Sequence, residues 1–534
     1  MATSKTLSAE NIQLGIFGST ISEPYSSDDA TLARLGKRPV LKRSFGFMTI
    51  LGFSCTVLIT WEGSLFVLLS GLQNGGPSGV IYGFLLVWGG MISVFATLSE
   101  LVSMAPTSAG QYHWVSMLAP SSSRKFLGYM TGWLTVAGWQ ATVASAAYST
   151  GTMIQGLILL THPEYQQPEQ NWQGTLLLWA VILLSYTINT AVGTLLAKFE
   201  GLVFFLHILG FFGVLLPMVL LKSEHASTED VFNTFANLGD WQTQGLSMCI
   251  GILGIVFAFV GGDSAIHMSE EIHNAATVVP WSILTGLLLN GTLGFAMMIA
   301  ILFCMGDVDA ATAENPRYPF MAIFHNAVGS TAGAAVMSAI VVFMTFSATT
   351  GCLASTSRVY WAFARDHGVP GWRYLKKVSP RTSIPTYSVL TSCVISVILS
   401  FVNIGDATAF NGIISVSIAG LFGSYLMAAS LLLYRRVTGA IHERNDDDTL
   451  TNTTGSGLSW GPWRLPGLFG TANNILCCSF LLFVLFFSFW PASREVTPQN
   501  MNWAVLVTVV VVAWSIVYYF AWARKTYSGP IIEV

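Results

Sequence analysis

Two long apolar stretches of this chain are interrupted by short polar tracts that contain glycine. The interruptions are Thr60-Trp61-Glu62-Gly63-Ser64 and Val260-Gly261-Gly262-Asp263-Ser264, about 200 residues apart. A bilayer offers no water to free backbone groups, so an unwound helix persists there only where it lines a cavity or meets a ligand. Paired interruptions at corresponding places in two halves of a chain are typical of the binding site of a transporter.

The composition places most of the chain in hydrocarbon. The 534 residues are 53% hydrophobic and only 10% charged, whereas a soluble protein carries roughly 25% charged residues. The seven cysteines lie in apolar runs without metal-ligand spacing, so neither a metal nor a cofactor is expected. The absence of a basic domain argues against a nucleic-acid partner. We therefore predict an all-α protein of the lipid bilayer.

Twelve apolar stretches approach the length of about 20 residues that a helix needs to cross a membrane. They are 47–71, 78–99, 126–157, 173–193, 200–221, 245–268, 280–305, 332–357, 386–403, 408–433, 470–491 and 502–523. With both termini in the cytoplasm, all but three of the 24 Lys and Arg residues are cytoplasmic, as the positive-inside rule requires. We expect a multi-pass protein of the plasma membrane with cytoplasmic termini.

These spans divide the chain into six parts. They are an N-terminal tail 1–46, spans one to five in 47–221, spans six to ten in 245–433, a cytoplasmic linker 434–469, spans eleven and twelve in 470–523, and a C-terminal tail 524–534. The tract 437–460 is polar, which favours a mobile linker. Its sequon begins at Asn452, faces the cytoplasm in this topology and is expected to stay unglycosylated.

Glu62 lies in the first interruption, where an ionised carboxylate costs several kcal/mol. No Lys or Arg lies centrally in any span, so the sequence leaves a proton or a cationic ligand to neutralise Glu62. The alternative is that Glu62 lies near extracellular water and caps the second half-helix. The freed amides at the start of that half-helix also suit an anion such as a carboxylate.

In the second interruption, Gly261 and Gly262 permit backbone conformations that other residues resist. Asp263 and Ser264 are expected to cap the half-helix that follows, a role compatible with ligand contact. The two interruptions supply the candidate substrate-binding residues Thr60, Trp61, Glu62, Gly63, Ser64, Gly261, Gly262, Asp263 and Ser264. Trp61, Phe257 and Phe259 flank them and offer faces for an ammonium group.

His207 lies in the middle of span five. A membrane histidine that takes and releases a proton near neutral pH would couple transport to a proton gradient. The alternative is a neutral histidine hydrogen-bonded to a neighbouring span. Hydroxyls of Thr345, Ser347, Thr349 and Thr350 in span eight suit either sodium or hydrogen bonds between helices, and the second role is the more frequent. Protons are thus the expected coupling ion, with sodium as the alternative.

His267, Glu270 and Glu271 follow the second interruption. His267 and Glu271 are four residues apart and share a helix face. We see no further ligands that would complete a metal site. The pattern predicts a polar gate or a network at the cytoplasmic end.

Four motifs resemble those of amino-acid permeases. Residues 99–112 (SELVSMAPTSAGQY) look like their loop signature, and 262–272 (GDSAIHMSEEI) with Asn274-Ala275 is similar to the sixth-span signature of the amino acid/choline transporter family. Residues 362–370 (AFARDHGVP) match the loop after span eight, and 60–62 (TWE) with 74–77 (NGGP) look like the fungal branch of GABA and choline permeases. The similarity covers roughly 40–525.

This resemblance implies a leucine-transporter-type fold in which spans one to five and six to ten are inverted repeats, with two extra spans. It implies secondary transport of an amino acid, GABA, choline or a related small amine by alternating access. Backbone contacts to the substrate would come from Thr60 to Ser64 and Gly261 to Ser264. Proton-coupled relatives carry a basic residue in span five, for which His207 is the candidate.

Four other functions compete with uptake by a transporter. A channel would conduct without saturation, and a nutrient sensor usually needs a longer cytoplasmic extension than this N-terminal tail. An enzyme is disfavoured because no span holds a nucleophile–base pair or a metal cluster. Export of a nitrogen-containing secondary metabolite fits the same sequence as uptake.

Overall fold

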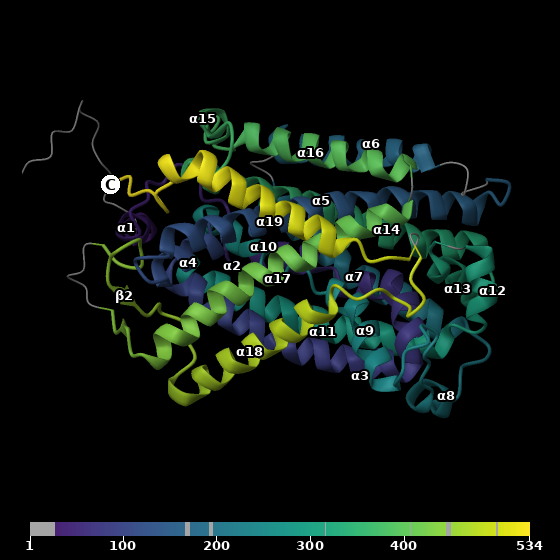
Figure 1. The fold of residues 1–534 in the computed structure, drawn as a ribbon. Coiled ribbons are helices and arrows are strands. Elements are labelled where there is room, and N and C mark those ends of the chain that lie inside the picture. Colours follow the sequence, from purple (N-terminus) through teal and green to yellow (C-terminus); the bar gives the residue numbers. More distant parts are fainter. Residues whose placement is uncertain are drawn as a thin grey trace, which may run out of the picture.

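The computed structural model describes residues 27–165, 171–191, 196–315, 317–405, 407–444, 450–497 and 500–534. Long helices lie side by side and make up most of this part of the chain (Figure 1). Residues 1–26 of the predicted N-terminal tail and 445–449 of the predicted linker lie outside the described residues.

The helical elements follow one another along the chain. They are α1 Ser27–Arg34, α2 Phe47–Leu58, α3 Thr60–Met104, α4 Gln111–Leu118, α5 Arg124–Thr161, α6 Asn171–Ala191, α7 Leu196–Leu221, α8 Thr228–Asn233, α9 Gln244–Phe257, α10 Ser264–His267, η2 Ser269–Glu271 and α11 Ala275–Cys304. There follow α12 Val308–Glu314, α13 Pro319–Val328, α14 Thr331–Arg365, α15 Trp372–Leu375, α16 Thr386–Gly405, α17 Ala407–Val437, α18 Gly467–Phe487, α19 Ala504–Ala521 and η3 Ala523–Lys525.

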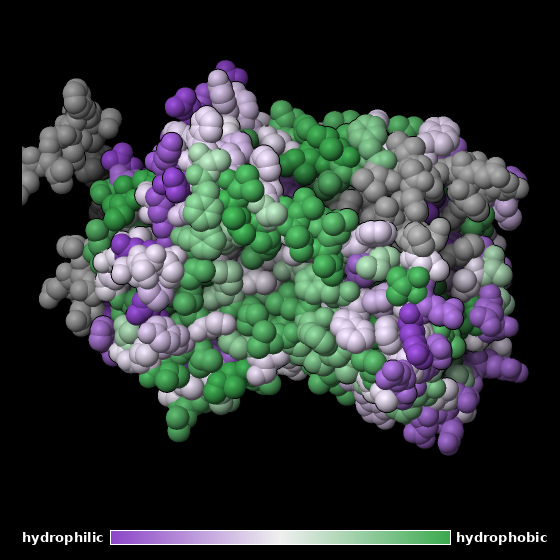
Figure 2. Space-filling view, in the orientation of Figure 1, coloured by the Kyte–Doolittle hydropathy of each residue, from purple (hydrophilic) through white to green (hydrophobic). Residues whose placement is uncertain are grey.

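Within the described residues, eight helical stretches are long and apolar enough to cross a bilayer. One of them combines α2 and α3, and α3 itself contains two helical parts because Asn74 and Gly76 leave helical geometry. Apolar side chains gather over the middle of the molecule and hydrophilic ones over its two ends (Figure 2). This distribution is that of a bundle surrounded by lipid, and it confirms an integral multi-pass membrane protein.

The helices pack in two groups around the interrupted segments. In the first, α3 packs along α11 and α9, and α2 lies against α7 and α11. In the second, α5 packs along α14 and α17, and α18 packs on α17. Helix α7 buries only one stripe, which includes Glu200, Val203, His207 and Phe211, while Leu202 and Phe205 between them are exposed. The stripe faces the bundle, and the rest of α7 suits lipid.

The two ends of the bundle differ in what they hold. We call the end with α1, α4, α15 and the C-terminal segment the tail end, and the end with α8, α12 and α13 the far end (Figure 1). At the tail end a parallel pair joins β1 (Ile441–His442) to β2 (Leu458–Ser459). The segment before α2 is fixed there too, because Phe45 pairs with Ile272 after the second interruption.

The predicted mobile linker is in fact folded where the structure describes it. Asn452 is buried, and its side-chain amide donates to the carbonyls of Met104 at 2.9 Å and Ser459 at 2.8 Å. The Asn452 carbonyl in turn lies 2.9 Å from Nε2 of His113 on α4. Polar composition misled the prediction because these polar groups bond to the bundle instead of to water. The buried amide has no room for a glycan in this conformation.

Candidate functional site

The first interruption lies at Ile59. Helix α2 ends at Leu58, Ile59 adopts a left-handed conformation with φ 34° and ψ 48°, and α3 begins at Thr60. The predicted tract Thr60 to Ser64 is therefore not unwound but forms the first turn of α3, one residue after the break. A β-branched residue in this conformation is strained, and such strain gathers at functional sites.

Asn290 of α11 bridges both sides of this break. Its Nδ2 lies 3.3 Å from the carbonyl of Cys55 in the last turn of α2, and its Oδ1 accepts from the amide of Thr60 at 3.3 Å. One side chain thus satisfies the amide of Thr60, and it adds a second donor to the Cys55 carbonyl, which also accepts from the amide of Ile59 at 3.2 Å. The buried side-chain amide of Asn290 therefore stabilises the helix interruption at Ile59.

The second interruption spans the turns between α9 and α10. Gly261 has φ +96°, which only glycine adopts without strain, and Ser264 N–H bonds back to its carbonyl at 3.0 Å. A side chain at Gly262 would come within 2.3 Å of the Phe95 ring. Gly261 is thus required for its backbone angle, as predicted for both glycines, whereas Gly262 is required for close packing.

Asp263 does not cap α10. Its side chain makes no capping bond, although Asp263 occupies the N-cap position. Instead the buried carboxylate accepts from Nε2 of Gln111 at 2.9 Å and lies 3.4 Å from Nε2 of His267. The carbonyl of Ser264 accepts from the Ser355 hydroxyl of α14 at 3.0 Å. The capping prediction is wrong, because Gln111 of α4 reaches the carboxylate from outside the local chain.

The two interruptions meet at a cavity inside the bundle. A side chain at Gly63 would come within 3.1 Å of the Ala258 Cβ, so the two broken segments touch directly. The cavity measures about 40 Å³, room for roughly three water molecules. Its lining residues are Val57, Leu58, Ile59, Gly63, Phe66, Thr142, Ala146, Ser149, Phe257, Ala258, Val260, Thr345, Ala348 and Cys352. Of the predicted substrate-binding residues, only Gly63 is among them.

Glu62 and His207 form a buried pair outside this cavity. Oε1 of Glu62 lies 2.8 Å from Nδ1 of His207, and both side chains are fully buried. The indole N–H of Trp61 lies 3.2 Å from the same Nδ1. The sequence argument considered only Lys and Arg as partners for Glu62 and so missed an imidazole on α7. A single ring nitrogen either donates to Glu62 or accepts from Trp61, so the arrangement depends on where the proton lies.

The other candidate groups are placed as follows. Trp61 packs against Phe211, and Phe259 against Phe84, so that of the three flanking aromatics only Phe257 lines the cavity.

In span eight, Thr349 lies 3.2 Å from Thr150 and Thr350 lies 3.1 Å from Ser185. These contacts are hydrogen bonds between helices, the more frequent of the two roles that we predicted.

Beyond the second interruption, the tail end holds a network of ion pairs. The pairs are Arg358–Glu271 at 2.7 Å, Arg365–Glu270 at 2.8 Å and Lys37–Asp366 at 2.7 Å. Burial alone would raise the pKa of Asp366, but Lys37 and Arg365 hold it below its ordinary value. The C-terminal segment joins this network, since the Ile531 amide donates to Asp366 at 2.9 Å. The polar network predicted around Glu270 and Glu271 is present, and its charged side chains are buried.

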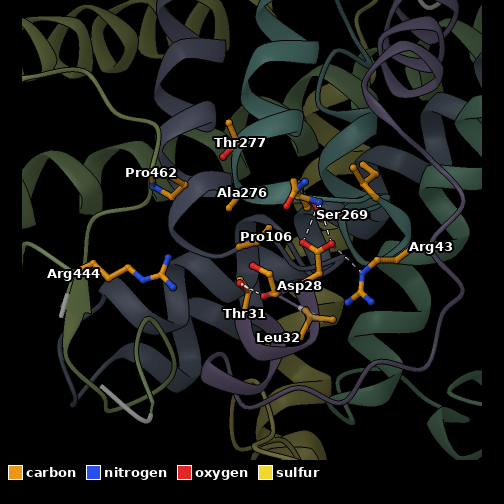
Figure 3. A pocket seen from close by; sticks show the side chains of 14 residues that line it. Asp28, Thr31, Leu32, Arg43, Pro106, Ser269, Ala276, Thr277, Arg444 and Pro462 are labelled. Carbon is orange, nitrogen blue, oxygen red and sulfur yellow. Dashed lines mark hydrogen bonds and ion pairs between the residues drawn. The ribbon is translucent and has the colours of Figure 1, made fainter. Parts of the chain in front are cut away.

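A second, separate cavity of about 130 Å³ lies at the tail end. Asp28 and Arg43 lie together on one side of it and Arg444 on the other (Figure 3). Both carboxylate oxygens of Asp28 accept from the amide of Asn274, at 3.0 and 3.1 Å. This contact ties α1 to the start of α11 beside the cavity.

Sequence reasoning missed several residues of this centre. Asn290 gave no signal, because one asparagine in an apolar span has many possible roles. Thr142 and Ser149 on α5 also gave no signal of a role at the cavity, since hydroxyl groups are common in membrane helices. Glu200 did offer a signal, because an acidic residue at the start of span five is costly in a membrane. In the part of the chain that the structure describes, no group of three metal-ligating side chains comes together.

Comparison with known proteins identifies the family of this chain. The model of a family described as amino acid permease matches residues 45–512. The choline transporter of Saccharomyces cerevisiae is 29% identical over 92% of this chain and 83% of its own. The GABA-specific permease of the same yeast is 25% identical over 94% and 86%, and amino-acid permease 2 of Neurospora crassa 25% over 95% and 89%. The predicted resemblance is confirmed: this chain belongs to the amino acid permease family.

Proposed function

We propose that this protein is a secondary transporter of an amino acid, GABA, choline or a related small amine. The observation that carries the proposal is the meeting of two helix interruptions at one cavity, at Gly63 and Ala258. Broken helices are stable inside a membrane only where they line such a space. The names of the related choline and GABA permeases support the substrate class.

We propose twelve spans, with spans one to five and six to ten as inverted repeats and both termini in the cytoplasm of a plasma-membrane protein. Each of the twelve expected ranges overlaps a helix, which supports the number. Arg373 and Lys376 belong to α15 and its C-cap, and Arg435 bonds to Leu118 of α4, so the tail end is basic, which supports a cytoplasmic position. The closed tail-end network then makes this the conformation that is shut toward the cytoplasm.

The cavity suits an ammonium group held without a carboxylate. Of the described acidic residues none lines it, whereas Phe66 and Phe257 present aromatic rings and Thr142 and Ser149 bring hydroxyl oxygens. Aromatic faces attract such cations. The amides at the start of α3 remain the proposed partners of a substrate carboxylate. At about 40 Å³ the cavity must widen before it holds such a solute.

The Glu62–His207 pair is the proposed proton carrier. With a proton on Nδ1, His207 donates to Glu62; without it, Nδ1 accepts from Trp61. Glu62 and Trp61 are in the first turn of α3 beside Gly63, so protonation of the pair and occupation of the cavity act on the same segment. Protonation would thus bias the position of the broken helix.

The test is uptake by the purified chain reconstituted in lipid vesicles. GABA, choline, polyamines and amino acids are supplied separately, with and without an imposed pH gradient. We expect saturable uptake of at least one amine that the gradient increases. Failure of every compound in both directions of the gradient, or conduction that never saturates, would refute the proposal.

A pair of glycine variants on α3 serves as the matched control. Gly63→Leu fills the cavity wall, whereas at Gly89 an added side chain meets open space. We expect Gly63→Leu to abolish uptake and Gly89→Leu to retain it. Equal uptake by the two variants would remove the cavity from the transport path.

A further inference from the structure

Glu200 is a buried carboxyl group that the proposed mechanism does not use. It lies on the buried stripe of α7, fully enclosed, seven residues before His207. Two helical turns separate the two residues, so both face the broken segment of α2 and α3. Glu200 faces α2, whereas His207 faces the start of α3.

In the part of the chain that the structure describes, the carboxyl group has one hydrogen-bond partner. The Thr56 hydroxyl of α2 lies 2.6 Å from Oε2 of Glu200, and Oε1 is buried without a donor among the described residues. No Lys, Arg or His of the described chain pairs with Glu200. A carboxylate so placed would carry an uncompensated charge in a membrane interior, which is strongly unfavourable.

Two glycines let the neighbouring helices pack closely against Glu200. A side chain at Gly52 of α2 would come within 3.1 Å of the Glu200 carbonyl oxygen, and one at Gly351 of α14 within 3.7 Å of Oε1. A sodium ion needs several oxygen ligands, and among the described residues the Thr56 hydroxyl is the one hydrogen-bond partner of the carboxyl group. A proton is the cation that fits this space.

The titratable groups on the surrounding helices do not compensate the charge. Cys352 of α14 is a neighbour of Glu200, and it is a thiol. On α2, Cys55 faces Asn290 of α11. His325 of α13 pairs with Glu314, and Lys198 on α7 itself is exposed. None of these supplies a positive charge to Glu200.

The Thr56 hydroxyl fits a neutral Glu200. Its Oγ1 lies 2.6 Å from Glu200 Oε2 and 3.3 Å from the carbonyl of Phe53, yet it owns only one proton to donate. If Oε2 carries a proton, Glu200 donates to Thr56, which in turn donates to Phe53, and every hydrogen points to an acceptor. The remaining Oε1 is then a neutral carbonyl oxygen, which is less costly to leave unpaired.

We propose that Glu200 is a second proton-binding site of the transporter, protonated while α2 is seated against α7 and α14. When α2 tilts away, the contact with Thr56 breaks, Glu200 meets water at the tail end, and the proton leaves as hydronium. Val57 and Cys352, which adjoin Thr56 and Gly351 in sequence, line the central cavity, so the solute and this proton act on the same two helices. The coupling part rests on the proposed function, whereas the protonation part does not.

Infrared spectroscopy of the purified full chain in lipid tests the protonation directly. A protonated carboxyl group gives a C=O band distinct from that of a carboxylate. We expect such a band at neutral pH, its loss in Glu200→Gln, and its shift in Thr56→Val, which keeps the carboxyl group and removes its partner. The control is Glu100→Gln, because Glu100 is paired with Arg436 and the Leu465 amide; it should leave the band unchanged. A band unaffected by the Glu200 and Thr56 variants would overturn the proposal.

Transport in vesicles tests the coupling. A gradient of one pH unit drives about tenfold accumulation for each coupled proton. We expect Glu200→Gln to lose one such factor while it still exchanges labelled for unlabelled amine at equal pH. Unchanged accumulation would overturn the coupling. A wild-type protein inert toward every amine would count against the proposed function, and the infrared result would still decide the state of Glu200.

Discussion

The acidic residues in the middle of the bundle and those at its tail end differ in their partners. At the tail end, Glu270, Glu271 and Asp366 each contact an Arg or Lys at 2.7–2.8 Å. In the middle, Glu62 pairs with a histidine and Glu200 with a threonine. A fixed cation stabilises one charge state, whereas a histidine or hydroxyl partner permits two. The tail end thus holds acidic groups in fixed charge pairs, whereas the partners in the middle permit two charge states, which the proposed proton exchange requires.

The largest effect should follow from breaking the Lys37–Asp366 pair. Asp366→Asn leaves a buried ammonium without its carboxylate, and we expect a loss of about 3–5 kcal/mol in stability. The double variant Lys37→Met/Asp366→Asn removes both charges and should recover most of that loss. Thermal unfolding in detergent measures both. Equal losses in the single and double variants would show that the pair does not hold the tail end shut.

A pH-dependent loss of stability of similar size should come from His113. Burial lowers the pKa of His113 to about 4, below the unfolded value of about 6.5. The folded state therefore favours neutral His113, whose contribution of about 3 kcal/mol is complete above pH 6.5 and is lost as the pH falls through 4. His113→Gln retains a donor for the Asn452 carbonyl but does not titrate. Its stability should fall less between pH 7 and 4 than that of the wild type, and identical curves would exclude His113.

Variants of the Glu62–His207 pair should have a smaller effect, on the response of uptake to a pH gradient. Glu62→Gln and His207→Ala should each remove most of the response of uptake to a pH gradient. The double variant should lose little more, with a coupling energy of about 0.5–3 kcal/mol. Additive losses would mean that the two residues act separately, and an unchanged pH response would leave His207 as a neutral structural partner.

The smallest effect should be that of Glu533, at the edge of the tail-end network. Its carboxylate lies 3.8 Å from Arg365 and is 22% exposed. Since such pairs contribute little, Glu533→Gln should cost less than about 1 kcal/mol. A loss of stability as large as that of Asp366→Asn would contradict this prediction. It would show that the C-terminal residues contribute strongly to the tail-end network.

The sequence predicted a helical, multi-pass membrane protein and its family because both depend on local pattern. Apolar length predicts helices in a membrane, and glycine predicts where they break. The sequence did not predict which side chains from distant segments come into contact. The histidine that meets Glu62 is 145 residues away, and the glutamine that meets Asp263 is 152 residues away. The side of each helix that faces the cavity depends on packing, so most candidate residues lie near the cavity instead of in its wall.

The Asn290 bridge has a consequence for the speed of transport. Tilting α2 away from α3 releases one hydrogen bond of Asn290, a cost of about 1 kcal/mol. The buried charges of the tail end cost several times more to separate. We therefore expect separation of the buried ion pairs at the tail end to be the slow step of the turnover cycle. The movement of α2 relative to α3 at Ile59 should be fast once those pairs have separated.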